Sequence, residues 1–201
     1  MDTLYGKSIS SEREDDLDRM ALDSISGRSG IKAMDLCCGQ GGMAKKLNPL
    51  CSLVLAIDLR PGISSAGTLF SLRQDIRKPF RVPFLPFDLI VFQRAIHYLS
   101  WQDATRLLLR MKGWIKKEGC LYISASGIES ELGTEYQGKG IPIEKRMAHL
   151  SPEMMEKHEI MEPVCLYSMD EFRTLLESTG WTVKRSFTSP FGNLKAVAHV
   201  S

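Results

Sequence analysis

The strongest constraint on the fold is the stretch from Ala33 to Leu47, which reads AMDLCCGQGGMAKKL. It begins apolar, has three glycines in its middle, and from Met43 onward its apolar residues recur at helical spacing. This pattern predicts a strand, a tight turn and a helix. Glycine permits the positive φ angles and the close ligand approach that such a turn requires. Because the helix also begins with free N–H groups and a partial positive charge, the stretch predicts a cradle for a nucleotide cofactor.

Two classes of cofactor compete for this turn. Gly39, Gly41 and Ala44 match the dinucleotide fingerprint G-x-G-x-x-[G/A]. Asp58 follows about 20 residues later, where that fingerprint places a ribose-binding acid. However, Asp35 lies inside the preceding strand, and a dinucleotide fingerprint usually follows an uncharged apolar strand. An NAD(P)-dependent oxidoreductase therefore remains the second hypothesis, and Asp35 disfavours it.

The string DLCCGQGG, from Asp35 to Gly42, resembles motif I of the class I S-adenosylmethionine-dependent methyltransferases, commonly D-x-G-x-G-x-G with Cys often before the second glycine. Cys37 stands where that family has its first glycine. The resemblance implies S-adenosyl-L-methionine as cofactor and S-adenosyl-L-homocysteine as product. It also implies that this turn contacts the cofactor through four residues, Asp35, Cys38, Gly39 and Gly41.

Two further acids follow the next predicted strands. The apolar run from Ser52 to Ile57 is typical of a strand buried on both faces, and it ends in Asp58. A carboxylate there can accept hydrogen bonds from both ribose hydroxyls, and we expect the adjacent Leu59 in the same site. After a strand at Phe70–Arg73, the resemblance implies that Asp75 binds the adenine amine and that the backbone of Ile76 meets the ring. Alternatively, Asp58 is a loop aspartate that caps the following turn, and Asp75 is an acid in a surface turn.

The segment from Phe87 to Phe92 reads FDLIVF and resembles motif IV of the same family. It predicts a central strand, whose carboxyl end is where open α/β sheets bind ligands. Gln93 is expected near the sulfonium, and Arg94 at the entrance to the acceptor pocket. His97 is a candidate base, although packing against the next helix is the more frequent role of such a histidine. Neither N-P-P-[YF] nor a Pro-Cys pair follows the strand, which disfavours DNA methylation.

The N-terminus predicts a helical cap over residues 1–27. Ser11-Glu12-Arg13-Glu14 forms a capping box, and apolar residues then recur at helical spacing to Ile25. Leading segments of related methyltransferases often close over the cofactor. We therefore expect Tyr5 in the cofactor site, with Lys7 and Arg13 as further candidates to reach the cofactor or the substrate.

Residues 126–167 are too many for an ordinary connection between a strand and a helix. The segment carries several glycines and a short helix from Ser151 to Met161, which opens with a capping serine and a proline. Its place after a central strand predicts a lid with acceptor-binding residues. Its polar candidates are Tyr136, Arg146, His149, Glu156 and His158, each weighed against a surface or packing role.

The remaining pattern completes an α/β domain. Ser100 predicts a helix cap, with apolar positions running from Trp101 to Ile115, and a turn then leads into the strand CLYISAS. A capping box at Ser168–Glu171 begins another helix, which Gly180 ends. Strands at Trp181–Phe187 and Leu194–Val200 close the chain. We expect one domain, residues 1–201, with a Rossmann-like, doubly wound, seven-stranded, mostly parallel sheet, an antiparallel last strand and helices on both faces.

Composition excludes several functional classes. The 201 residues carry a net charge of +2, which indicates neither nucleic-acid nor membrane binding. No apolar run approaches the ~20 residues of a membrane span, and no secretory signal is visible. Five cysteines without zinc-ligand spacing fit a reducing cytoplasm and predict no metal site.

These observations favour methyl transfer to a small-molecule acceptor, by in-line displacement at the activated methyl group. Such chemistry mainly needs alignment of acceptor and methyl, so a general base is optional. If the acceptor is a hydroxyl, the candidate bases are His97, His149 and His158. RNA and protein acceptors remain open, as do the oligomeric state and a non-catalytic protein that retains the fold.

Overall fold

The computed structural model of the protein describes residues 15–201 and contains one seven-stranded sheet. The strand order is β3-β2-β1-β4-β5-β7-β6, and β7 runs antiparallel to both of its neighbours, while β1 to β5 pair in parallel. The expected doubly wound sheet with an antiparallel last strand is therefore confirmed. The strands are β1 (Lys32–Leu36), β2 (Leu53–Asp58), β3 (Leu69–Arg73), β4 (Phe87–Phe92), β5 (Ile115–Ser126), β6 (Trp181–Thr188) and β7 (Asn193–Val200).

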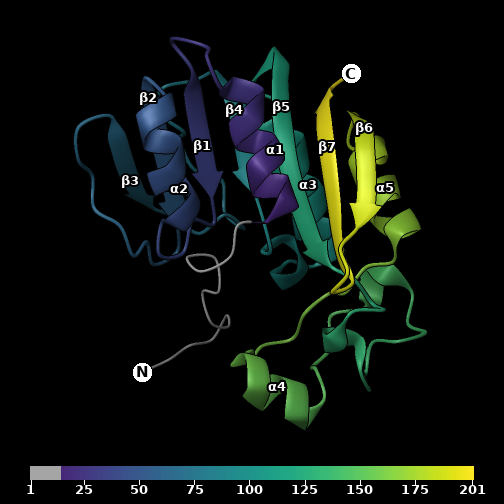
Figure 1. Cartoon of the computed structure of the whole chain (residues 1–201). Helices are drawn as coiled ribbons and strands as arrows, with labels where there is room; N and C mark the ends of the chain where they lie inside the picture. The colour runs from purple at the N-terminus through teal and green to yellow at the C-terminus, as the bar shows by residue number, and fades with distance from the viewer. Residues whose placement is uncertain (1–14) are drawn as a thin grey trace.

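Helices cover both faces of this sheet (Figure 1). The helices are α1 (Asp16–Ile25), α2 (Gly42–Leu47), α3 (Trp101–Met111), α4 (Pro152–His158) and α5 (Met169–Ser178), with 3-10 turns η1 (Asn48–Leu50), η2 (Ile96–Tyr98), η3 (Glu131–Gly133) and η4 (Ile143–Lys145). One apolar cluster joins α1 and α2 to the sheet, and a second joins α3 and α5 to its other face. Within residues 15–201, no helix has the length and apolar character needed to cross a bilayer.

The central strand β4 shows how the sequence produces these two layers. Its side chains alternate, so that Leu89 and Val91 pack toward α1 and α2, whereas Ile90 and Phe92 pack toward α3 and α5. All four are at most 1% exposed. Because burial of one such side chain stabilises the fold by roughly 1.5–3 kcal/mol, an apolar run of this kind belongs in the centre of the sheet.

The structure corrects two predicted helix ends and shows how α1 is capped. The predicted capping box at Ser11–Glu14 lies outside the described residues, and α1 is capped by Asp15, whose carboxylate accepts a 2.8 Å hydrogen bond from Leu17 N. Helix α3 ends at Met111, so Ile115 lies in β5 and not in the helix. The physical reason is that the Trp114 carbonyl accepts a 2.8 Å hydrogen bond from Phe87 N, which draws the chain into the sheet. Helix α4 ends at His158, before the predicted Met161, because Glu159 takes a left-handed conformation with φ 56°.

The predicted caps at the other helices are confirmed. The Ser100 hydroxyl accepts a hydrogen bond from Asp103 N at 3.1 Å, and Ser151 caps α4 in the same way. At α5 both halves of the capping box form, since Glu171 N donates to the Ser168 hydroxyl and Ser168 N donates to the Glu171 carboxylate. These caps fix where each helix begins and hence which face it buries.

The segment between β5 and α5 folds on its own small apolar cluster, beyond the carboxyl ends of the parallel strands (Figure 1). Isolated bridges join Gly127 to Tyr167 and Ala148 to Val164. This segment, residues 127–167, is called the insertion below. It forms one side of the cavity described next.

Candidate active site

A cavity of about 1460 Å³ lies at the carboxyl ends of β1, β2, β4 and β5 and at the beginning of β7. The strand order reverses there, because β2 and β3 lie on one side of β1 and β4 lies on the other. Open α/β sheets bind their ligands at such a switch point. The insertion and the first residues of α1 complete the walls.

The glycine turn between β1 and α2 forms the floor of the cavity on the β1 side. Gly39 and Gly41 have φ angles of 51° and 75°, in the left-handed region that favours glycine. Gly39 lines the cavity. Gly41 lies outside the lining, and a Cβ there would come within 2.7 Å of the Ile63 side chain. The glycine at position 41 is therefore required by φ and by packing against Ile63.

Cys37 has a φ of 61°, so it takes the left-handed conformation that the glycine of the resembling motif would adopt without strain. Cys37 and Cys38 both line the cavity. Burial raises the pKa of both thiols well above their ordinary value. The two thiols are therefore protonated near neutral pH and are weak nucleophiles.

Two carboxylates hold the turn in place from below. Asp35 is buried, and its Oδ2 accepts a 2.9 Å hydrogen bond from Ala44 N, in the first turn of α2. Burial raises the pKa of Asp35 to about 7. Asp58 accepts from Gly39 N through Oδ2 and from Arg60 N through Oδ1, each at 2.9 Å. Because a carboxylate has about four acceptor sites, Asp58 keeps capacity for further hydroxyl donors.

The predicted adenine side of the site lies at the ends of β2 and β3, where Leu59, Asp75 and Ile76 all line the cavity. The Arg77 guanidinium pairs with Asp75 at 2.9 Å and, by these hydrogen bonds, lowers the pKa of that carboxyl. Asp75 is therefore ionised and able to accept a hydrogen bond from an amine. The structure therefore brings Leu59, Asp75 and Ile76 to one cavity, and the adenine role of Asp75 and Ile76 stays a prediction.

Asp18 is a site residue that the sequence analysis missed. It lies on α1, is only 2% exposed, and lines the cavity. Gln93 Nε2 donates to Asp18 Oδ1, while Gln93 Oε1 is buried and has no hydrogen-bond partner among residues 15–201. Desolvation raises the pKa of Asp18. The sequence does carry a signal for Asp18, because this acid lies on the apolar face of α1, beside Leu17 and Ala21.

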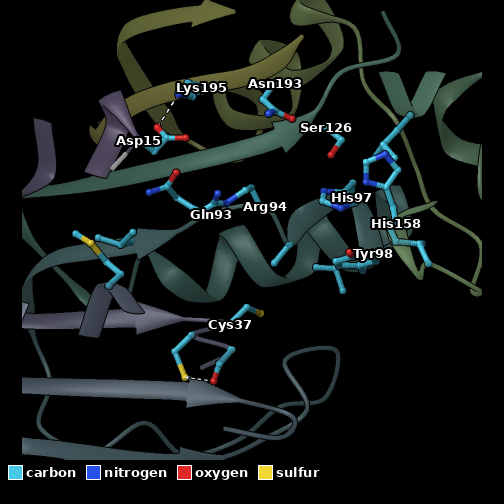
Figure 2. A pocket seen from close by; sticks show the side chains of 18 of the residues that line it. Asp15, Cys37, Gln93, Arg94, His97, Tyr98, Ser126, His158, Asn193 and Lys195 are labelled. Atoms are coloured by element: carbon cyan, nitrogen blue, oxygen red, sulfur yellow. Dashed lines mark hydrogen bonds and ion pairs between the residues drawn. The ribbon is translucent and has the colours of Figure 1, made fainter. Parts of the chain in front are cut away.

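A second contact joins α1 to β7. Lys195 is buried, and its ammonium lies 2.6 Å from Asp15 Oδ1 (Figure 2). Both residues line the cavity. The pair fixes the beginning of α1 beside Gln93, and thereby places Asp18 at the site.

The three predicted catalytic residues all line the cavity. Arg94 follows β4 with a φ of 52°, and its N–H donates to the Ser124 hydroxyl at 3.0 Å. His97 is 3% exposed, its Nδ1 has no partner in the described part of the chain, and burial lowers its pKa to about 3. His158, at the end of α4, is drawn on the same side of the cavity as His97 in Figure 2, and its Nε2 lies 3.3 Å from a Glu131 carboxylate oxygen.

Several other candidates lie away from the cavity. The Tyr136 hydroxyl contacts the carbonyls of Arg146 and Val164 at 2.6 Å, and Arg146 pairs with Glu171 at 2.6 and 2.8 Å, so both residues support the insertion. His149 and Glu156 are exposed and do not line the cavity. Tyr5, Lys7 and Arg13 lie outside the described residues. From residue 15 onward, no cluster of three or more His, Cys, Asp or Glu side chains could hold a metal ion.

The chain resembles one protein family over most of its length. A family model described as a methyltransferase domain matches residues 6–186. A search of the curated proteins finds no significant match by sequence.

Three solved structures share the fold at low sequence identity. The S-adenosylmethionine-dependent methyltransferase from Mesorhizobium loti has a TM-score of 0.68 at 16% identity, over 91% of this chain and 97% of that one. The Burkholderia thailandensis 1,6-didemethyltoxoflavin-N1-methyltransferase, bound to 1,6-didemethyltoxoflavin and S-adenosylhomocysteine, has a TM-score of 0.66 at 14% identity, over 94% and 80%. The putative methyltransferase in complex with the Haloferax volcanii activator Trm112 has a TM-score of 0.66 at 17% identity, over 90% and 87%.

Proposed function

Because the chain belongs to the methyltransferase domain family, we propose that it transfers a methyl group from S-adenosylmethionine to a small-molecule acceptor. The observation that carries this proposal is the charge around the glycine turn. Asp18 and Asp58 line the cavity there, together with Asp35, which with a pKa of about 7 is partly ionised at neutral pH. Carboxylates favour a cation such as a sulfonium and repel the pyrophosphate of a dinucleotide. The same turn, in this acidic setting, therefore supports the methyltransferase over the oxidoreductase.

The residues present fit the cofactor. Asp58 offers acceptor positions for the ribose hydroxyls, and Asp75 with Ile76 forms the adenine side. Gln93 Oε1 is a buried acceptor that meets no donor among residues 15–201, and with Asp18 it suits the positive amino group at the other end of the cofactor. When bound, S-adenosylmethionine supplies a methyl group that its positive sulfur has already activated.

The remaining cavity suits a small acceptor. Sites for drug-sized ligands occupy roughly 300–1,000 Å³, and this cavity measures about 1460 Å³. It therefore has room for a second compound beside the cofactor. The insertion, with His158 and Ile160, closes the side of the cavity that faces away from Asp58, which supports its role as a lid over the acceptor.

Catalysis in this site rests on alignment. Holding two reactants at near-attack distance can lower a barrier by up to about 7–11 kcal/mol. With its pKa lowered to about 3, His97 is a neutral hydrogen-bonding group that can orient an acceptor. A proton released by the acceptor then passes to solvent through the mouth of the cavity, with His158 as the candidate relay at the rim.

The test is transfer of label from methyl-labelled S-adenosylmethionine to a panel of small hydroxyl, amine, thiol and carboxylate compounds. The proposal expects labelled product with at least one compound, and loss of that product in Asp58→Ala. Transfer only to RNA or protein would overturn the small-molecule acceptor. Tight binding of S-adenosylhomocysteine without transfer to any acceptor would instead indicate a binding protein with this fold.

A further inference from the structure

The acceptor side of the cavity contains Arg94, His97 and Ser126 at the ends of β4 and β5, with Asn193 from β7 and His158 from α4 (Figure 2). This group of five is called the acceptor subsite. Its charges and unsatisfied polar groups indicate the chemical class of compound that binds there. The inference rests on the proposed function, because it assumes that the cofactor occupies the other side of the cavity.

The acids around this subsite already have cationic partners. Asp15 pairs with Lys195 at 2.6 Å, and Glu131 pairs with Lys157 and lies 3.3 Å from His158 Nε2. At the rim, Glu129 lies 3.5 Å from the ammonium of Lys139. These carboxylates are therefore neutralised locally and offer little to a cationic acceptor.

The side chain of Arg94 differs from these acids in its contacts. Its guanidinium forms no hydrogen bond or ion pair with any residue of the described range 15–201. The charge of Arg94 lowers the pKa of Asp18 and Asp35 against the raising effect of burial, although no ion pair joins Arg94 to either acid among the described residues. A guanidinium carries five N–H donors in a planar fork that matches a carboxylate or phosphate. Within residues 15–201, Arg94 thus brings to the cavity a positive charge that no ion pair neutralises, together with unused N–H donors.

The backbone holds Arg94 in this place. Its φ of 52° is an uncommon conformation for a residue with a Cβ, and its N–H donates to the Ser124 hydroxyl of β5 at 3.0 Å. Conformations of this kind persist where the surrounding structure fixes them, often at functional sites. The turn directs the chain from β4 into η2, which carries His97 at the same subsite.

His97 adds a second, neutral polar group. The ring is 3% exposed and lines the cavity, and its Nδ1 has no partner among the described residues. A buried polar atom without a partner costs free energy that a bound ligand can recover. In the view of Figure 2, Arg94 lies beside Gln93 and below Asn193, and His97 lies farther along, below Ser126.

We propose that the methyl acceptor is an anionic small molecule, whose carboxylate binds the guanidinium of Arg94 while a neighbouring polar group bonds His97. The acceptor's acid group lies at the boundary between the two sides of the cavity. It neutralises Arg94 and leaves the acids around the glycine turn to the cationic cofactor.

The experiment uses the full chain saturated with S-adenosylhomocysteine. A panel of small aromatic and aliphatic carboxylic acids is titrated by calorimetry, each beside its primary amide, which has nearly the same shape and no charge. The proteins are wild type, Arg94→Met, Arg94→Lys and the control Arg106→Met, whose side chain lies on the exposed face of α3. Affinity for S-adenosylhomocysteine is measured for each variant.

Wild type is expected to bind at least one acid ten-fold or more tightly than its amide. Arg94→Met abolishes that preference, Arg94→Lys retains part of it, and Arg106→Met changes nothing, with S-adenosylhomocysteine affinity within two-fold throughout. The proposal is overturned if no acid is preferred over its amide. It is equally overturned if Arg94→Met weakens S-adenosylhomocysteine ten-fold, because the guanidinium then binds the cofactor's own carboxylate. If wild type does not bind S-adenosylhomocysteine, the proposed function fails, and the same titrations on the free protein still decide the acid preference.

Discussion

At the scale of single residues, the site is a set of carboxylates whose surroundings keep them in different states. Asp75 is stabilised as an anion by Arg77, whereas Asp35 is buried with one backbone hydrogen bond and a pKa of about 7. Asp58 is half-buried and bonded to two backbone N–H groups. Asp35 and Asp75 therefore respond differently to pH.

Asp58→Ala removes the acceptor proposed for the ribose hydroxyls. Hydrogen bonds to a charged group contribute about 1.5–3 kcal/mol, so S-adenosylhomocysteine should bind roughly 10- to 150-fold more weakly by calorimetry. Asp58→Asn is the matched control, because it retains one oxygen of similar position and should lose less affinity. An unchanged affinity in the alanine variant would refute the ribose role.

Asp35→Asn tests the burial of a carboxylate at the centre of the turn. The pKa of Asp35 is raised in the folded protein to about 7, so the folded state binds its proton more tightly than the unfolded state. Wild type therefore loses stability as pH rises from about 4 to 7, by an amount on the order of a few kcal/mol, and the asparagine variant does not.

The measurement is urea unfolding of the free protein at several pH values. The free energy of unfolding of Asp35→Asn should increase relative to wild type across this interval and then stay constant above about pH 7. A difference between the two proteins that does not change with pH would contradict the raised pKa.

At the scale of elements, the glycine turn could be predicted almost completely from sequence. The strand, turn and helix at Ala33–Leu47 form as expected, because φ and packing requirements are encoded locally by glycine. The departure at Cys37 is explained by its left-handed φ of 61°, which sequence spacing alone does not reveal. The ends of α3 and α4 were wrong because they depend on contacts with the sheet and on a left-handed residue.

The insertion shows the opposite case, in which position was predicted and roles were not. The sequence predicts Tyr136 and Arg146 as candidates for acceptor binding, yet the hydrogen bonds of both side chains stabilise the insertion. Arg146 is 7% exposed and donates to two backbone carbonyls as well as to Glu171. Sequence alone cannot distinguish a buried structural arginine from a ligand-binding one.

Arg146→Met should lower the free energy of unfolding by about 3 kcal/mol. That is the low end for breaking a buried ion pair, because the Glu171 side chain is 26% exposed. Arg146 and the Ser168 N–H hold the pKa of Glu171 below its ordinary value, so the pair stabilises above about pH 4.5 and is lost as pH falls further.

Urea unfolding at pH 7 measures this effect, with exposed Lys145→Met as the matched control. The affinity for S-adenosylhomocysteine should remain within two-fold of wild type, because Arg146 lies outside the cavity. A ten-fold loss of that affinity with unchanged stability would show that Arg146 serves the site directly.

At the scale of the whole molecule, hydrophobic patterning was sufficient to predict the sheet, and long-range contacts were not predictable. The apolar runs gave the central strands, and the two closing strands pair antiparallel as expected. Asp15 and Lys195, by contrast, meet across 180 residues of sequence, and Asp18 reaches Gln93 across 75. Helical spacing shows that α1 buries one face, but not which strand end that face meets.

The central claim is that an acidic glycine turn at the switch point of this sheet binds a sulfonium nucleoside. The most direct test is calorimetric titration of the wild-type protein with S-adenosylmethionine, S-adenosylhomocysteine and NAD under identical conditions. Both sulfur compounds should bind saturably, one per protein molecule, and NAD should show no detectable binding. Binding of NAD without either sulfur compound, or binding of none of the three, would contradict it.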